Sequence, residues 1–192
     1  MLPSLEGRKV LDVGCGDGEL TEKLAKLGAD VTDIDANPDM IAAAQHRHAG
    51  TYRVADAAAL PFADDTFDAV TAVTVLCVCD DPKKLVGEIT RVLKPGGSLV
   101  IGELGKWSLW ALSRRLRGLV GNRMWSEAHF FTMTELKTLA ADAGLHVRTA
   151  RGAIFYPPLG LSTVFLSEID PALGRVFGGL GAAFISLSAQ KH

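Results

Sequence analysis

The chain has 192 residues, a length that favours one domain spanning residues 1–192 with a sizeable core. Its net charge is −2 and its pI is about 6.2, so the overall charge balance gives no indication of a nucleic-acid partner. Three cysteines, Cys15, Cys77 and Cys79, form neither a disulfide framework nor a zinc set, and we expect no metal site. The first strand is expected almost at the start, and no apolar stretch reaches the roughly 20 residues of a membrane span. We therefore expect no signal peptide and a cytoplasmic location.

The first predicted unit is a strand, a glycine-rich turn and a helix. An apolar run at residues 10–13 predicts a buried strand, and Gly14, Gly16 and Gly18 follow it directly. Leucines spaced four and three residues apart predict a helix over residues 20–27. Such a unit holds a nucleotide at the carboxyl end of a parallel sheet, because glycines let ligand and backbone approach closely and the helix start offers free N–H groups.

A second strand, expected at residues 30–35, ends in the carboxylate of Asp35. A carboxylate at this distance from a glycine loop can accept both hydroxyls of a ribose. A dinucleotide-binding loop would need its third glycine at position 19, where Glu19 stands. The spacing therefore disfavours an NAD-dependent oxidoreductase.

The rest of the chain alternates helices with strands. Further helices are expected at residues 37–48, 81–93 and 132–144, the last of them opened by a capping box that begins at Thr132. Further strands are expected at residues 52–55, 67–75, 98–103, 145–156 and 182–189. A sharp turn is expected at residues 94–97. Repeated alternation with short loops predicts an α/β fold with a doubly wound parallel sheet.

These motifs together resemble the class I S-adenosylmethionine-dependent methyltransferases, in particular their small-molecule, type 11-like members. The first motif of that family has an acid two residues before Gly-x-Gly-x-Gly, and Asp12 stands at that position. Phe-Asp-Ala-Val at residues 67–70 and Arg-Val-Leu-Lys-Pro-Gly-Gly at residues 91–97 also match. The resemblance is strong over residues 8–103 and weak over the last strands. It implies a Rossmann-like, doubly wound seven-stranded sheet, mostly parallel with an antiparallel last strand.

The resemblance also implies S-adenosyl-L-methionine as cofactor. Asp35 matches the ribose acid; Asp33 lies two residues earlier on the same face, but Asn37-Pro38 follows Asp35 at the family spacing. The Asp56 carboxylate and the Ala57 N–H can pair with the adenine edge. The full set of expected cofactor-binding residues is Asp12, Gly14, Cys15, Gly16, Gly18, Asp35, Ala36, Met40, Asp56, Ala57 and Val73.

Two departures from the family pattern bear on the class of substrate and on the catalytic base. Members that methylate bases carry Asn/Asp-Pro-Pro-Tyr/Phe after the fourth strand, whereas this chain has Thr-Val-Leu-Cys at residues 74–77, so we expect no nucleic-acid substrate. Many small-molecule relatives have histidine at the position of Cys77. A base is optional, because positioning a nucleophile against a sulfonium can supply much of the acceleration. Among His129, Glu103 and Tyr156, we select His129 as the candidate catalytic residue.

Residues 104–131 are expected to be a helical lid insertion, with a helix at residues 107–120. Its leucines share one face, while Trp107, Trp110, Arg114 and Arg117 share the opposite face. Residues 106–125 hold five basic side chains and no acidic one. One interpretation is that the tryptophan and arginine face meets lipid headgroups, a peripheral membrane contact through residues 107–120, or an anionic ligand. The other, which we prefer, is a lid whose leucine face covers the core.

A second insertion, residues 157–181, joins the last two strands and is rich in Phe, Leu and Gly. Two apolar insertions over the cofactor edge predict a small lipophilic or aromatic methyl acceptor, such as a quinone precursor, a polyketide or a lipid. The alternative is a catalytically weak cofactor-binding scaffold, or a subunit completed by a partner chain. The sequence leaves the oligomeric state open.

Overall fold

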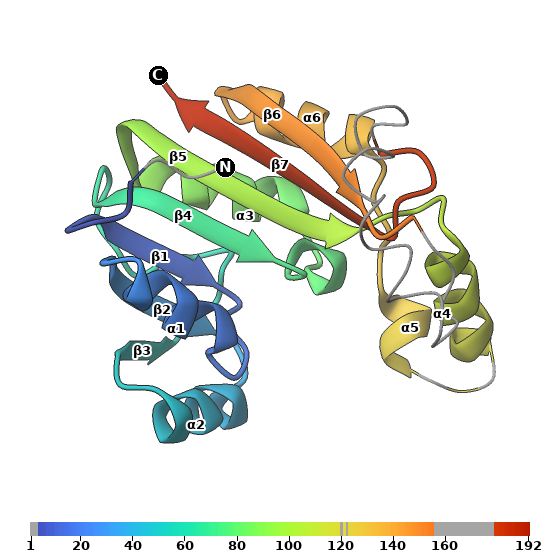
Figure 1. The fold of residues 1–192 in the computed structure, drawn as a ribbon, viewed down its shortest axis with the longest axis horizontal. Coiled ribbons are helices and arrows are strands. Elements are labelled where there is room, and N and C mark those ends of the chain that lie inside the picture. The colour runs from blue at the N-terminus through green and yellow to red at the C-terminus, as the bar shows by residue number, and fades with distance from the viewer. Residues whose placement is uncertain (1–3, 120, 122, 156–178) are drawn as a thin grey trace.

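A computed structural model describes residues 4–119, 121, 123–155 and 179–192, and it is built on one seven-stranded sheet (Figure 1). The strand order is β3-β2-β1-β4-β5-β7-β6. The strands are β1 (Lys9–Val13), β2 (Asp30–Asp35), β3 (Thr51–Val54), β4 (Phe67–Val73), β5 (Leu93–Leu104), β6 (Leu145–Ala153) and β7 (Phe184–Lys191). β1 to β5 pair in parallel, whereas β7 runs antiparallel to both β5 and β6. The expected fold class is confirmed, including its antiparallel last strand.

The helices follow the strands as the alternation predicts. They are α1 (Glu19–Lys26), α2 (Pro38–Arg47), α3 (Pro82–Val92), α4 (Leu109–Leu119), α5 (Arg123–Glu127) and α6 (Met133–Asp142), with a 3-10 turn η1 (Leu76–Val78) after β4. Three helix starts have the side-chain caps that the sequence indicates. The Asn37 side chain accepts from Asp39 N at 2.9 Å, Asp81 accepts from Lys84 N at 3.0 Å, and Thr132 forms a complete capping box.

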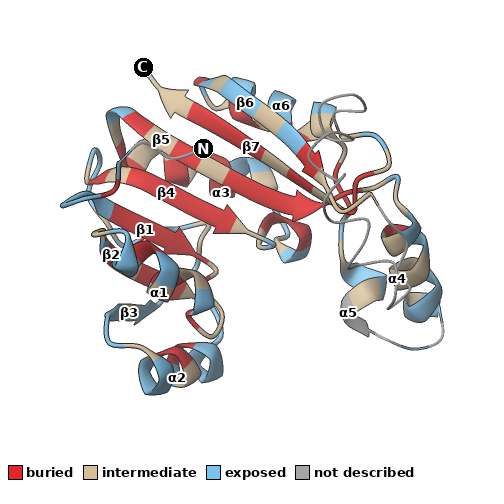
Figure 2. Ribbon diagram, in the orientation of Figure 1, coloured by how far each residue is buried: buried red, intermediate tan, exposed pale blue. Residues whose placement is uncertain are grey.

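Alternation along the strands divides the core between the two faces of the sheet. Val10, Val31 and Ala69 lie side by side in register and pack against α1. The neighbouring residues of the same strands belong to the larger cluster on the other face, which includes residues of α3, and α6 extends that cluster over β6 and β7. The central strands are buried along most of their length, which is why they read as continuous apolar runs (Figure 2).

Several strand boundaries differ from the expected ones, and two of the differences have a local cause in the backbone. β4 ends at Val73, two residues early, because Thr74 adopts a left-handed φ of 55° and its N–H bonds to Gly102 O at 2.7 Å. β5 begins at Leu93, so the turn expected at residues 94–97 is a bulge within the strand, with Gly96 at φ 77°. The early end of β4 matters for function, because residues 74 and 75 then leave the sheet and line the cavity described below.

The segment between β5 and α6 forms two short helices, α4 and α5, beyond the carboxyl end of β5 (Figure 1). The leucine face of α4 does not cover the core, so the preferred lid interpretation is wrong in orientation. Leu109, Leu112, Leu116 and Leu119 are all exposed, and Ala111 is the buried residue of the helix. Most of the second expected insertion, residues 157–178 of 157–181, lies outside the described residues.

Candidate functional site

The loop between β1 and α1 contains three left-handed glycines, which alternate with Cys15 and Asp17. Gly14, Gly16 and Gly18 have φ values of 71°, 56° and 81°. A Cβ on Gly14 would lie 2.7 Å from Cγ2 of Val75, so this position excludes any side chain. The N–H groups of Gly14 and Cys15 both donate to Ile34 O, at 2.8 and 3.0 Å, which fixes the loop against the end of β2.

The Asp35 carboxylate at the end of β2 is held in place by the loop and by the next helix. Its Oδ2 accepts from Gly16 N at 3.0 Å, and its Oδ1 accepts from Asn37 N at 2.8 Å. Each carboxylate oxygen has two lone pairs, so both oxygens can also accept from a ligand hydroxyl. The alternative acid, Asp33, is buried and accepts from Thr21 Oγ1 at 2.5 Å, whereas Asp35 lines the cavity described next.

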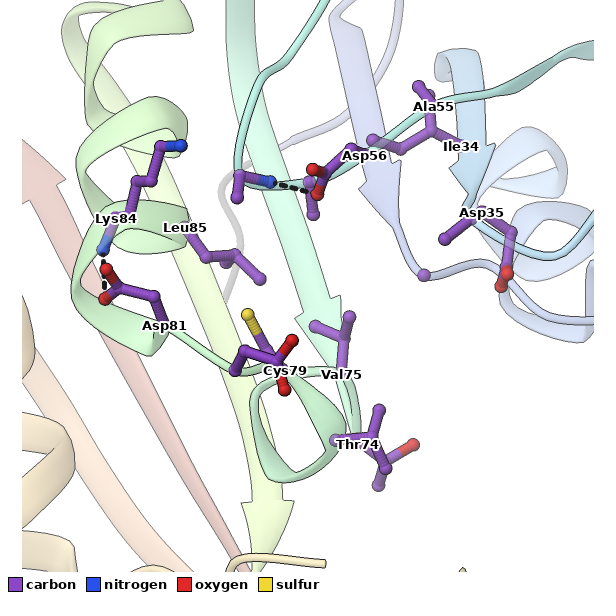
Figure 3. A pocket seen from close by; sticks show the side chains of 16 residues that line it. Ile34, Asp35, Ala55, Asp56, Thr74, Val75, Cys79, Asp81, Lys84 and Leu85 are labelled. Atoms are coloured by element: carbon purple, nitrogen blue, oxygen red, sulfur yellow. Dashed lines mark hydrogen bonds between the residues drawn. The ribbon is translucent and has the colours of Figure 1, made fainter. Parts of the chain in front are cut away.

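A cavity of about 590 Å³ opens at the carboxyl ends of β1, β2 and β4 (Figure 3). Five of the expected cofactor-binding residues line it: Gly14, Asp35, Ala36, Asp56 and Ala57. The other six do not line it: Asp12, Cys15, Gly16, Gly18, Met40 and Val73. Gly16 and Gly18 shape the loop and Cys15 is buried, whereas Met40 is exposed in the first turn of α2.

Asp56 and Ala57 form a polar corner in this cavity. The Asp56 carboxylate is exposed, and its Oδ1 accepts from Ala58 N at 2.8 Å in a local turn (Figure 3). Within the described part of the chain, the Ala57 N–H donates to no acceptor. A carboxylate acceptor beside an uncommitted N–H donor matches the donor and acceptor pair at an adenine edge.

The opposite wall of the cavity comes from residues that the sequence did not single out. Thr74, Val75, Val78 and Cys79 follow β4, Asp80 and Asp81 directly precede α3, and Lys84 and Leu85 come from its first turn. Figure 3 shows Thr74, Val75 and Cys79 on this wall, across the cavity from Asp35. The Asp81-Pro82 helix start was the available signal, because a helix after β4 must begin at the same edge as the glycine loop.

Two buried carboxyl groups lie side by side beneath the glycine loop. Asp12 and Asp33 are register partners on β1 and β2, and Thr71 Oγ1 donates to Asp12 Oδ1 at 2.6 Å. Burial raises the pKa of Asp12 to about 7, and the nearby charges of Asp33 and Asp35 add to the effect. Burial also raises the pKa of Asp33 to about 6. A cationic ligand above the loop would favour the ionised form of Asp12.

Glu103 is a third buried acid, near the carboxyl end of β5. Its Oε1 accepts from Leu76 N at 2.7 Å and so ties β5 to η1. Among the described residues, its Oε2 has no hydrogen-bond partner. Burial raises the pKa of Glu103 to about 7 and that of the neighbouring Cys77 thiol to about 12. Cys77 is therefore a protonated packing residue rather than a nucleophile.

His129 lies outside the first cavity. Its backbone N–H donates to Cys77 O at 2.8 Å, and its ring packs edge-on against Phe131 with centroids 4.5 Å apart. It lines a second cavity of about 580 Å³ between the start of α3 and α6. Cys79 and Asp80 line both cavities, so the two hollows adjoin at that segment.

The inner face of α4 carries an aromatic and cationic cluster. The Arg114 guanidinium lies over the rings of Trp110 and Trp125, 5.5 and 5.0 Å from their centroids, and joins α4 to α5. Burial lowers the pKa of Arg114, while the neighbouring Cys77 acts in the opposite direction. Arg114 therefore lies close to η1, which contains Cys77.

The donor set fits the cofactor that the sequence motifs imply. The cavity has the size of a typical small-molecule site, with one acid where a ribose is expected and an acceptor and donor pair where adenine is expected. In the described part of the chain, no cluster of His, Cys, Asp and Glu side chains is arranged to hold a metal ion.

Comparisons with known proteins agree with this site. Residues 11–101 match the family model described as a methyltransferase domain. The chain is 37% identical over 172 residues to the ubiquinone biosynthesis O-methyltransferase of Methylococcus capsulatus, covering 82% of this chain and 71% of that protein. It is 43% identical over 101 residues to the demethylmenaquinone methyltransferase of Renibacterium salmoninarum, covering 52% of this chain but only 43% of that protein.

Solved structures show the same fold. An S-adenosylmethionine-dependent methyltransferase of Thermotoga maritima superposes with a TM-score of 0.75 at 24% identity, covering all of this chain (100%) and 84% of that one. One from Methanosarcina mazei superposes with a TM-score of 0.70 at 26% identity, covering 97% and 93%. Because the chain has the glycine loop and the Asp35 carboxylate of the family motifs and is similar to these relatives, it belongs to the S-adenosylmethionine-dependent methyltransferases.

Proposed function

We propose that this enzyme transfers the methyl group of S-adenosylmethionine to a small lipophilic or aromatic acceptor, with the acceptor held beside Cys79 and Asp80. The observation that carries the proposal is the pair of adjoining cavities. The first has the polar corners that a nucleoside needs, and the second adds Phe131 and Leu139 next to the hydrogen-bonding groups of His129 and Thr138.

Residues of this chain would orient both reactants. Asp35 would accept from the ribose hydroxyls, and Asp56 with Ala57 would pair with the adenine edge. When bound, the cofactor supplies a methyl group already activated on a sulfonium sulfur. The protein then needs chiefly to align the acceptor atom and exclude water. We propose that His129, which lines the second cavity, hydrogen-bonds the acceptor there as its catalytic role.

The identity of the acceptor class draws support from the relatives. Two of them are named for ubiquinone and menaquinone chemistry, whose acceptors are quinone precursors. The exposed leucines of α4 agree with an acceptor of low polarity. A hydroxylated aromatic ring with an apolar tail is the acceptor we would test first.

The test is methyl transfer by the isolated chain to a panel of acceptors. The panel contains hydroxylated aromatic quinone precursors with and without an apolar tail, together with polar amines as a contrast. We expect turnover with the aromatic acceptors and faster turnover with the tailed ones. Turnover with the amines alone would overturn the acceptor class. Cofactor binding without turnover of any acceptor, restored by a partner chain, would instead support the scaffold interpretation.

A further inference from the structure

The outer face of α4 is an unusual surface for a chain of this size. Leu109, Leu112, Leu116 and Leu119 recur at intervals of three and four residues and are 57%, 53%, 55% and 83% exposed. Spaced in this way, they form one continuous stripe along the helix. We call these four residues the leucine stripe.

The stripe is not a core face left uncovered by chance, because α4 already has an inner face. Ala111 is buried, and Trp110 and Arg114 lie on the side that meets Trp125 of α5. On a helical wheel the leucine stripe lies opposite this inner face. An amphipathic helix that buries a polar and aromatic side while exposing its leucines marks an interaction surface.

The segment that carries the stripe has an excess of positive charge. Residues 106–125 contain five basic residues and no acidic one, although the whole chain has a net charge of −2. Arg117 is exposed at the edge of the opposite face, and Trp107 is exposed just before the helix. Arg115 lies at the other border of the stripe, with its guanidinium 5.0 Å from the centroid of the Phe130 ring. Lys106 lies near the Trp107 ring and also pairs with Glu135. Leucines bordered by arginine, lysine and tryptophan suit the boundary between acyl chains and anionic headgroups.

We propose that α4 docks this protein on an anionic lipid bilayer, with the leucine stripe toward the acyl chains and the flanking basic side chains at the headgroups. A two-fold contact with a second copy fits less well, because it would bring two sets of arginines together without an acidic residue from this segment to pair with them. In the sequence-based interpretation with membrane contact, the tryptophan and arginine face of this helix met the lipid. In the orientation proposed here, the leucine face meets it.

The residues just before α4 are joined by backbone contacts to a residue that lines the second cavity. Lys106 N donates to Phe131 O at 2.8 Å, and Gly105 pairs with Phe131, which also lines the second cavity. A lipophilic acceptor would therefore have a short path from the bilayer to the site. This consequence rests on the proposed function, whereas lipid binding itself does not.

The test is sedimentation of the full chain with vesicles of phosphatidylcholine alone or mixed with phosphatidylglycerol. We expect binding to the mixed vesicles that weakens as salt is added. Leu112→Ser combined with Leu116→Ser should weaken it at least roughly tenfold, because two exposed leucines no longer enter the bilayer. Leu27→Ser, at a leucine that is 61% exposed after α1, is the matched control and should bind as wild type.

Charge is tested separately. Arg117→Gln should weaken binding to the mixed vesicles, and Lys137→Gln, at an exposed position on α6, should not. Unchanged cofactor affinity in all four variants shows that they are folded. Equal binding to both kinds of vesicle, or no effect of the leucine substitutions, would overturn the proposal. A concentration-dependent dimer that the double substitution abolishes would assign the stripe to a second copy instead.

Discussion

The cofactor edge and the α4–α5 segment show two different relations between sequence and structure. At the cofactor edge, residue types dictate backbone geometry. The left-handed positions 14, 16 and 18 require glycine, and Asp35 must stand at the end of β2 for its carboxylate to reach the loop. In α4 the residue pattern dictates only which side chains share a face. Which way that face points depends on what the rest of the chain offers to cover it. The first region is therefore specified locally, and the second is specified by its surroundings.

The largest effect that separates the two regions should come from Gly14→Ala. A left-handed φ costs a side chain about 1–2 kcal/mol, and the new Cβ would also displace Val75 from the cavity wall. We expect cofactor affinity, measured by calorimetric titration, to fall roughly 100-fold or more. Gly96→Ala is the control: it has the same handedness of φ with nothing within 4 Å, at the other end of the sheet. It should lower the free energy of unfolding and leave cofactor affinity intact.

A smaller loss is expected from Asp35→Ala. The substitution removes charge-assisted hydrogen bonds worth about 1.5–3 kcal/mol, which corresponds to a roughly 10- to 150-fold weaker cofactor. Asp39→Ala, at an exposed acid in the next helix, changes the net charge by the same amount as Asp35→Ala and should bind the cofactor normally. If both variants bind as wild type and remain folded, Asp35 is not the ribose acid.

Asp12 and Glu103 allow a comparison of two buried acids with different roles. The pKa of each is raised to about 7, from an unfolded value of about 4, so the folded chain holds more protons between these values. The free energy of unfolding of the ligand-free protein should therefore fall as pH rises from about 4 to about 7.

Asp12→Asn and Glu103→Gln should each raise the free energy of unfolding at pH 8 by about 1–3 kcal/mol and lose that advantage toward pH 4. Both amides can still accept the hydrogen bonds from Thr71 and from Leu76 N. Only Asp12→Asn should weaken binding of the cationic cofactor, several-fold, since Glu103 contacts η1 rather than the loop. Equal effects of the two variants on cofactor affinity would show that Asp12 has no role in cofactor binding that Glu103 lacks.

The smallest effect concerns His129, which lines the second cavity. His129→Asn should raise the acceptor KM less than tenfold, with cofactor affinity unchanged, because the ring offers one hydrogen bond to a neutral acceptor. A hundredfold fall in kcat at constant KM would show that His129 transfers a proton instead.

The sequence sufficed for the features whose geometry one residue type demands. The glycine loop, Asp35, the helix caps and the antiparallel last strand all follow from such signals or from the family resemblance, and the structure has them. The far wall of the cavity was missed because β4 ends at Thr74, which has a left-handed φ. A threonine does not predict that conformation, because β-branched residues rarely adopt it. The direction of the leucine stripe was missed because amphipathicity is the same for a helix facing inward or outward.

The most direct test of the central claim is transfer of labelled methyl from S-adenosylmethionine into an extract of host cells, followed by partition between organic solvent and water. The wild-type chain is compared with Asp35→Ala. The account predicts label in the organic phase with the wild type and little with the variant. Label confined to the aqueous phase would contradict a lipophilic acceptor and show that the apolar surface of α4 does not serve the reaction.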